Sequence, residues 1–287
     1  MLDKIVPKKI KHLIDLIRLD KPIGFLLLMW PCFMALANLP QSNVKLIYWY
    51  IYFIAGAFLM RSAGCIINDL VDIKLDKNVK RTAERPLASK KVSVTEAITL
   101  LLVLLLLSLS ILLQFSFYVI IIGLVSIPLV LLYPFLKRYT YWPQLGLGLL
   151  FNWGVLIVSV QFNGTISFSF FLLYIACVFW TLAYDTIYAY QDREDDIKNN
   201  IKSTAVLFGN NGYKYVRVFY SVFYIIIGFL GFYSSKSFLS LVVIIALIFV
   251  MSLHLKKWKF DSTNSSNHYF KFNNIIGLLC FLYLVIF

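Results

Sequence analysis

Long apolar runs alternate with short polar segments along most of this chain. Runs of about 18–23 apolar residues can cross a bilayer as helices. Most of the segments between them are short enough to be turns, whereas 69–93 and 189–213 are long and charged. The pattern predicts an all-α, multi-pass membrane protein with one domain over 1–287. The expected spans are 22–39, 46–68, 94–113, 116–135, 143–162, 167–188, 214–233, 237–255 and 270–287.

The first 20 residues precede these spans and have a different pattern. Lysines are interspersed with apolar residues at helical spacing, which is typical of a basic amphipathic helix. We expect this segment, 1–20, to lie on the membrane surface. Its apolar positions are Ile10, Leu13, Ile14 and Ile17.

Composition supports the membrane prediction, and charge orients the bundle. The chain is 60% hydrophobic and 14% charged, against about 25% charged in soluble domains. With nine alternating spans, 24 of the 27 Lys and Arg residues fall on one side, Lys45 and Lys236 on the other, and Arg61 within a span. Positive charge marks cytoplasmic loops, so we expect the N-terminus in the cytoplasm and the C-terminus outside. The positive-inside distribution then accounts for the net charge of +13, and no nucleic-acid partner is expected.

Acidic residues are scarce, and most of them gather in two windows. Of the 14 Asp and Glu residues, three lie within 68–76 and five within 185–196. Each window lies at the end of an even-numbered span, so both are expected on the cytoplasmic side. Residues three and four apart share a helix face, which predicts one stripe in each window. The first stripe is Asn68, Asp72 and Asp76 with Asp69 at its edge, and the second is Asp185, Asp192 and Asp196 joined by Tyr188.

Two facing stripes of oxygen ligands suit Mg²⁺, which combines a few carboxylates with water and substrate phosphate oxygens. Basic residues follow both stripes or lie between them, and Arg and Lys bind phosphate oxygens well. A single cluster of this kind is often only a solvated loop, but two on one side favour a site for a diphosphate. A lipid-facing bundle with such a site predicts a polyprenyl diphosphate substrate. The cations expected to bind diphosphate are Lys80, Arg81, Arg85, Arg138, Lys198 and Lys202.

The same residues resemble the UbiA superfamily of intramembrane prenyltransferases. Asn68–Asp76 matches that family's N-D-x-x-D-x-x-x-D motif, and Asp192–Asp196 matches its D-x-x-x-D element. Longer stretches are similar to the 4-hydroxybenzoate polyprenyltransferase branch. These read RLDKPIG from Arg18, RSAGCIIND from Arg61, KRTAERPL from Lys80, YPFLKRYT from Tyr133 and IKSTAVLFG from Ile201.

The resemblance implies nine transmembrane helices around a central cavity that cytoplasmic loops cap. It also implies prenyl transfer from polyprenyl diphosphate to the ring carbon ortho to the hydroxyl of 4-hydroxybenzoate, a Mg²⁺-dependent step of ubiquinone biosynthesis in the bacterial inner membrane. Membrane lipid would surround the enzyme. The implied metal ligands are Asn68, Asp72, Asp76, Asp192 and Asp196. The expected catalytic residues are Asp72, Asp192 and Arg138. The expected acceptor-binding residues are Arg18, Asp69, Asp185 and Tyr188.

Other functions fit the sequence less well. Acidic residues in membrane helices often mark ion pathways in transporters, but these acids lie at the interface, and the two halves show no inverted repeat of interrupted helices. A CDP-alcohol phosphotransferase would carry a D-G-x-x-A-R core, which is absent from the sequence. Within the superfamily, the alternatives are the haem O, menaquinone and chlorophyll types.

Overall fold

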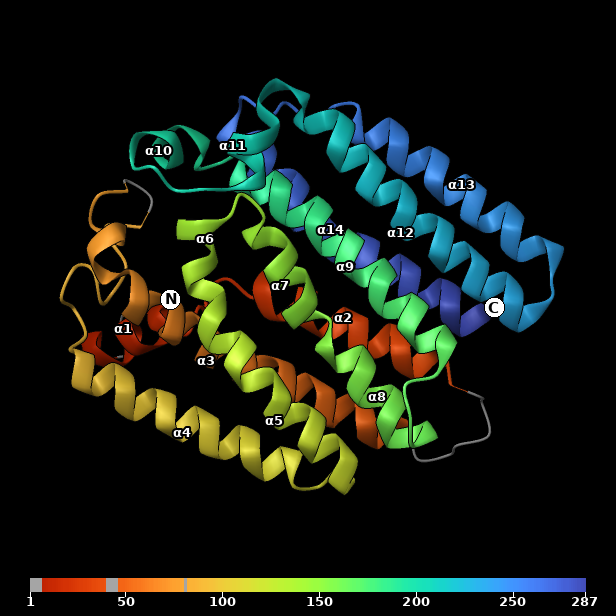
Figure 1. The fold of residues 1–287 in the computed structure, drawn as a ribbon, viewed down its shortest axis with the longest axis horizontal. Helices are drawn as coiled ribbons and strands as arrows, with labels where there is room; N and C mark the ends of the chain where they lie inside the picture. The colour runs from red at the N-terminus through yellow and green to blue at the C-terminus, as the bar shows by residue number, and fades with distance from the viewer. Residues whose placement is uncertain (1–6, 40–45, 80–81) are drawn as a thin grey trace.

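The structure is a computed structural model that describes residues 7–39, 46–79 and 82–287. Within these ranges every regular element is a helix, so the all-α prediction is confirmed (Figure 1). The helices are α1 (Lys8–Leu16), α2 (Ile23–Ala37), α3 (Leu46–Asp76), α4 (Val94–Leu112), α5 (Phe117–Leu132), η2 (Tyr133–Phe135), α6 (Leu136–Tyr139), α7 (Pro143–Phe151), α8 (Trp153–Asn163), α9 (Phe168–Ala189), α10 (Arg193–Lys198), α11 (Thr204–Phe208), η3 (Gly209–Asn211), α12 (Gly212–Ser235), α13 (Phe238–Leu255) and α14 (Thr263–Ile286).

Eight helical stretches of the described residues are long and apolar enough to cross a membrane. They coincide with the second to ninth predicted spans. The first predicted span, 22–39, contains only the 15-residue apolar helix α2, which is shorter than a bilayer usually requires. The count of nine spans is therefore not confirmed, although nine apolar segments occur where they were expected.

Helix α9 forms the centre of the bundle, with α12, α7 and α14 packed around it (Figure 1). Its most apolar window is 72% buried, whereas the windows of α4 and of α5 are each only 11% buried. The exposed leucines and isoleucines of α4 and α5 are what lipid requires, since a helix facing hydrocarbon keeps apolar side chains outside.

A hydrogen-bonded hub joins three of the central helices. The indole N–H of Trp180 and the hydroxyl of Tyr220 both donate to Asn273 Oδ1, each at 2.8 Å. These residues come from α9, α12 and α14, and Asn273 is fully buried. Polar side chains that bond across helices in this way hold membrane bundles together.

The first acidic window belongs to a helix that continues past the predicted span. We expected the span to end at residue 68, but α3 continues to Asp76. The spacing prediction for Asn68, Asp72 and Asp76 therefore holds, because all three lie on one continuous helix.

The second acidic window does not form one stripe, so that prediction was wrong. Helix α9 ends at Ala189, and Asp192 is the N-cap of the separate helix α10. Tyr190 accounts for the break: its hydroxyl donates to the Gly209 carbonyl at 2.5 Å, and its ring packs edge-on against Trp258. Asp185 consequently belongs to α9, whereas Asp192 and Asp196 belong to α10.

The N-terminal helix α1 packs its apolar side against protein. Leu16 is fully buried, and Leu13 and Ile17 contact the cluster that includes Ala63 and Ile66 of α3. Residues 1–6 lie outside the described ranges. The location of segment 1–20 at the membrane surface stays a prediction.

Candidate active site

A cavity of about 1220 Å³ lies among α1, α2, α3, α7, α9 and α14. Its wall changes character from charged and polar to apolar. The charged part includes Arg18, Lys21, Asp69, Arg85, Lys91 and Lys271. The apolar part includes Leu26, Leu27, Met60, Leu147, Leu150 and Phe151.

The last turns of α3 hold two carboxylates that share a cation. Arg18 Nη2 donates to both oxygens of Asp69, at 2.7 and 2.9 Å. Arg85 Nη1 lies 3.1 Å from Asp69 Oδ1 and 2.9 Å from Asp76 Oδ2. Both acids are buried, and Arg85 thus ties the loop after α3 to two carboxylates that lie about two turns apart on α3. A buried carboxylate needs such partners, because an unpaired buried charge is costly.

Asp72, between these two acids, takes its partners from α6. The carboxylate is fully buried, and Lys137 forms an ion pair with its Oδ2. Arg138 Nη2 lies 3.6 Å from Oδ1 and donates to the carbonyl of Val71 at 3.3 Å. Within the described part of the chain, Asp72 Oδ1 has no hydrogen-bond donor.

The loop after the second acidic window rests on the same α6. Lys202 donates from its backbone N–H to the Lys137 carbonyl at 2.9 Å and from Nζ to the Tyr139 carbonyl at 3.0 Å. Asp196 is buried, and its carbonyl accepts from Ile201 N at 2.9 Å, which closes the loop. Helix α6 therefore connects the two acidic windows, with Asp72 on one side and the 198–202 loop on the other.

Only part of the predicted site lines the cavity. Asn68, Asp69, Asp185, Tyr188, Arg18 and Arg85 do so. Asp72, Asp76, Asp192, Asp196, Arg138, Lys198 and Lys202 are not among its lining residues. Lys80 and Arg81 lie outside the described ranges. Asp72 is fully buried against Lys137 of α6.

The oxygen donors of the acidic windows fit a hard cation such as Mg²⁺. Among residues 7–39, 46–79 and 82–287, no three Asp, Glu, His or Cys side chains converge as metal ligands. The available donors are oxygens, which Mg²⁺ prefers. The buried Asp72 Oδ1 in particular has a free acceptor position.

Glu84 lies at the cavity wall and is exposed. Lys91 Nζ donates to it at 2.9 Å, and this hydrogen bond holds the pKa of Glu84 below its ordinary value. The pair therefore keeps opposite charges at neutral pH on the loop that follows α3.

Arg61 is a further functional candidate, which lies outside both acidic windows. Its guanidinium lies in the cavity wall, 5.5 Å from the centroid of the Phe151 ring and close enough to Asp185 for electrostatic attraction. Gly24 leaves room for it, since a Cβ there would come within 2.5 Å of Arg61 Nε. The available signal was its position: the other cations within predicted spans, Lys214, Arg217 and Lys271, lie within four residues of a span end, whereas Arg61 lies deeper in the span 46–68. Charges at such positions are usually functional.

Residues 28–275 match the family model described as the UbiA prenyltransferase family. The chain belongs to this family. The chain is 41% identical over 281 residues to a 4-hydroxybenzoate octaprenyltransferase of Francisella tularensis subsp. tularensis, covering 97% of this chain and 98% of that protein. It is 46% identical over 215 residues to the mitochondrial 4-hydroxybenzoate polyprenyltransferase of Caenorhabditis elegans, covering 74% of this chain and 60% of that relative. Family membership and the apolar helices identify an integral membrane protein.

Solved structures share the fold. A UbiA homolog from Aeropyrum pernix K1 superposes with a TM-score of 0.72 at 20% identity, covering 92% of this chain and 97% of that one. A UbiA homolog from Archaeoglobus fulgidus, bound to GPP and Mg²⁺, gives a TM-score of 0.68 at 16% identity, covering 96% and 100%. These structures show the shared fold, whereas the family model and the 41% identical relative confirm the family resemblance expected from the two motifs.

Proposed function

We propose that this protein transfers a polyprenyl group from polyprenyl diphosphate to the ring carbon ortho to the hydroxyl of 4-hydroxybenzoate, as a step of ubiquinone biosynthesis. The observation that carries the proposal is the 41% identity, over 97% of the chain, to a protein named for this activity. The cavity supports it, since one part of its wall is charged and another is apolar. Such a wall suits a substrate with a diphosphate head and a hydrocarbon tail.

Metal dependence forms part of the proposal. The A. fulgidus homolog is bound to GPP and Mg²⁺, and the oxygen donors of both acidic windows fit that ion. Bound Mg²⁺ would stabilise the negative charge of the leaving diphosphate. The residues proposed to hold it are Asn68, Asp72, Asp76, Asp192 and Asp196.

The cations around the acidic windows would bind the diphosphate. Arg85 and Lys137 already lie against carboxylates of α3, and Arg138 is 41% exposed beside Asp72. A forked guanidinium can donate to two phosphate oxygens. The proposed diphosphate-binding set is Arg85, Arg138, Lys198 and Lys202, with Lys80 and Arg81 outside the described residues.

The acceptor needs a cation for its carboxylate, and three arginines line the cavity: Arg18, Arg61 and Arg85, the last of which is proposed above to bind the diphosphate. Arg18 is already paired with Asp69. Arg61 Nε has no hydrogen-bond acceptor within the described chain, so Arg61 is our first choice and Arg18 the second. Asp69, Asp185 and Tyr188 would complete the acceptor site.

The reaction breaks the allylic C–O bond heterolytically and forms a C–C bond at the ring. Diphosphate leaves with the electron pair, the ring attacks the allylic cation, and the ring proton is then lost. Asp192 is proposed to take up that proton. The apolar wall would exclude water, which would otherwise quench the cation to an alcohol.

Orientation is also proposed. The N-terminus would lie in the cytoplasm and the C-terminus outside a bacterial inner membrane. The support is the distribution of Lys and Arg described above.

The test is an assay of the detergent-purified full-length protein with labelled 4-hydroxybenzoate and prenyl diphosphates of increasing chain length. We expect a prenylated product, no turnover in EDTA, and recovery when Mg²⁺ is added back. Transport needs two compartments, whereas catalysis does not, so turnover in detergent separates these functions. Full activity without metal would exclude the proposed mechanism, and absence of product with every chain length would exclude the proposed function.

A further inference from the structure

Helices α12, α13 and α14 lie on one flank of the bundle (Figure 1). Side chains of these three helices line a second crevice. It is narrow and encloses about 30 Å³. None of its lining residues lines the active-site cavity. Most of its wall is apolar or aromatic, including Ile248, Met251, Phe272 and Ile276.

Two polar groups of this crevice lack partners. Tyr224 is only 3% exposed, and its hydroxyl forms no hydrogen bond within the described chain. The same holds for His254 Nε2, whose ring stacks on Phe272 at 4.0 Å. A buried polar group without a partner is destabilising, so these two groups indicate that the crevice binds something polar.

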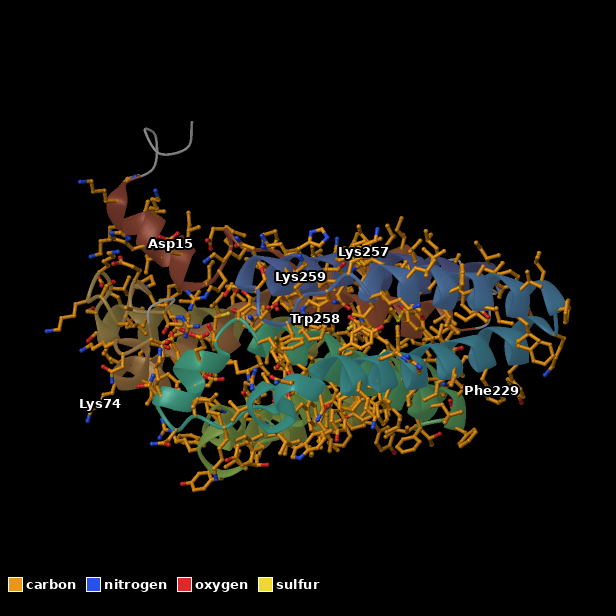
Figure 2. All side chains as sticks on the ribbon, turned by 90° about the horizontal axis from the view of Figure 1, so that it is seen from above. Asp15, Lys74, Phe229, Lys257, Trp258 and Lys259 are labelled. Carbon is orange, nitrogen blue, oxygen red and sulfur yellow. The ribbon has the colours of Figure 1, made fainter. Side chains whose placement is uncertain are left out.

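Positive charge surrounds one end of the crevice. Arg217 lines it and is exposed. Lys214 lies three residues earlier on α12, and Lys256 and Lys257 follow α13 directly; Figure 2 labels Lys257 at this turn. Within the described residues, none of these four cations forms an ion pair with Asp or Glu.

We propose that this crevice binds an anionic phospholipid. The phosphate would lie at Arg217, and the glycerol ester region would extend toward the Tyr224 hydroxyl. Seven residues separate the two, about 10 Å along α12, and helical side chains tilt toward the N-terminus, which brings the Tyr224 ring toward Arg217. A free anion would gain nothing from the apolar wall, whereas an acyl chain would cover it.

The flank favours lipid over a protein partner. The most apolar window of α13 is only 17% buried, and Phe249, Val250 and Leu253 are exposed beside the crevice. The exposed surface of α13 is so apolar that it requires surrounding hydrocarbon. Basic pockets between transmembrane helices bind anionic headgroups for the same electrostatic reason.

The first experiment measures bound lipid by native mass spectrometry on the detergent-purified full chain, titrated with phosphatidylglycerol or phosphatidylcholine. The parent should bind phosphatidylglycerol about fivefold more tightly, the contribution expected from one cation near a headgroup. Arg217→Gln should abolish that preference. Lys236→Gln, at the other end of α12, should retain it. Equal binding of the two lipids by the parent, or equal loss in both variants, would overturn the proposal.

Two further variants separate headgroup recognition from packing. Ser221→Phe should fill the crevice and lower the binding of both lipids; Ser221 bonds only to its own helix, at Arg217 O. Tyr224→Phe should not lower the melting temperature without lipid, because it removes an unpartnered hydroxyl. It should, however, reduce the rise in melting temperature that phosphatidylglycerol produces. An unchanged lipid-dependent rise in Tyr224→Phe, together with unchanged binding in Ser221→Phe, would contradict the proposal.

Discussion

Each buried carboxylate at the end of α3 has a cation of its own or shares one. Arg18 and Arg85 hold Asp69, Lys137 holds Asp72, and Arg85 also holds Asp76. Burying a charge without such a partner costs several kcal/mol. The cations proposed to bind the diphosphate are therefore, in part, the residues that keep the carboxylates in place.

We expect Asp72→Asn and Asp192→Asn each to lower turnover by at least about 100-fold, the scale of losing one charge-stabilising group in an active site. The assay is product formation at saturating Mg²⁺, with size-exclusion behaviour as the folding check. Asp195→Asn is the matched control, because Asp195 also lies in α10 but outside the D-x-x-x-D pattern. Near-normal rates in either motif variant would refute the two-window metal site.

Arg138→Ala should raise KM for prenyl diphosphate about tenfold, since a hydrogen bond to a charged group contributes about 1.5–3 kcal/mol. Arg138→Lys should recover only part of this, because Lys lacks the fork that binds two oxygens. Steady-state kinetics with varied diphosphate would measure both effects. Lys74→Ala is the control: Lys74 lies in the last turn of α3 and projects away from the body of the protein (Figure 2). Identical kinetics in Arg138→Ala and the parent would show that Arg138 does not bind the diphosphate and contributes only to the charge asymmetry that orients the protein in the membrane.

At the scale of single residues, the sequence predicted the acids better than their partners. Spacing places Asn68, Asp72 and Asp76 on one face regardless of packing, because α3 is one helix. The pairing of Lys137 with Asp72 joins residues 65 positions apart. Hydropathy carries no information about such a contact, and the same limit applies to Arg61 beside Phe151.

At the scale of helices, the apolar runs predicted where the long apolar helices lie, but not the positions at which these helices are interrupted. Asn152 interrupts the span 143–163 while remaining buried, because its side-chain amide donates to the Gly148 carbonyl at 2.6 Å and to Thr181 Oγ1 at 3.0 Å. Tyr190 likewise ends α9 through a contact with the distant Gly209. Both breaks depend on tertiary partners, so local pattern alone could not reveal them.

The hub at Asn273 gives a stability prediction. Asn273→Leu would leave the Trp180 N–H and the Tyr220 hydroxyl without their acceptor, at about 1–3 kcal/mol for each buried group. We expect a melting temperature several degrees lower in detergent, measured by thermal inactivation or aggregation. Asn264→Leu, at an exposed position of the same helix, should leave it unchanged. A melting temperature equal to that of the parent would mean that the hub contributes no stability.

At the scale of the whole molecule, the lopsided distribution of charge predicts one orientation. In a cysteine-free background, single cysteines at Lys91 and Lys198 should react with impermeant maleimide only from the cytoplasmic side. Cysteines at Asn163 and Ser234 should react only from the other side. All four positions are exposed. Labelling of positions 91 and 198 from opposite faces would put the two acidic windows on opposite sides of the membrane, and one diphosphate could not bridge them.

The length of α3 has a mechanical consequence. Its 31 residues span about 46 Å, which exceeds the thickness of a hydrocarbon core of about 30 Å. One continuous helix, a rigid rod, therefore contains both the membrane-spanning segment and the first acidic motif. A thicker or thinner bilayer changes the tilt of such a rod and with it the height of Asp72 above the lipid. Asp192 follows the break after α9 and is the N-cap of a different helix, α10. Bilayer thickness would therefore set the separation of the two motifs, and prenyl transfer in vesicles should depend on the acyl-chain length of the surrounding lipid.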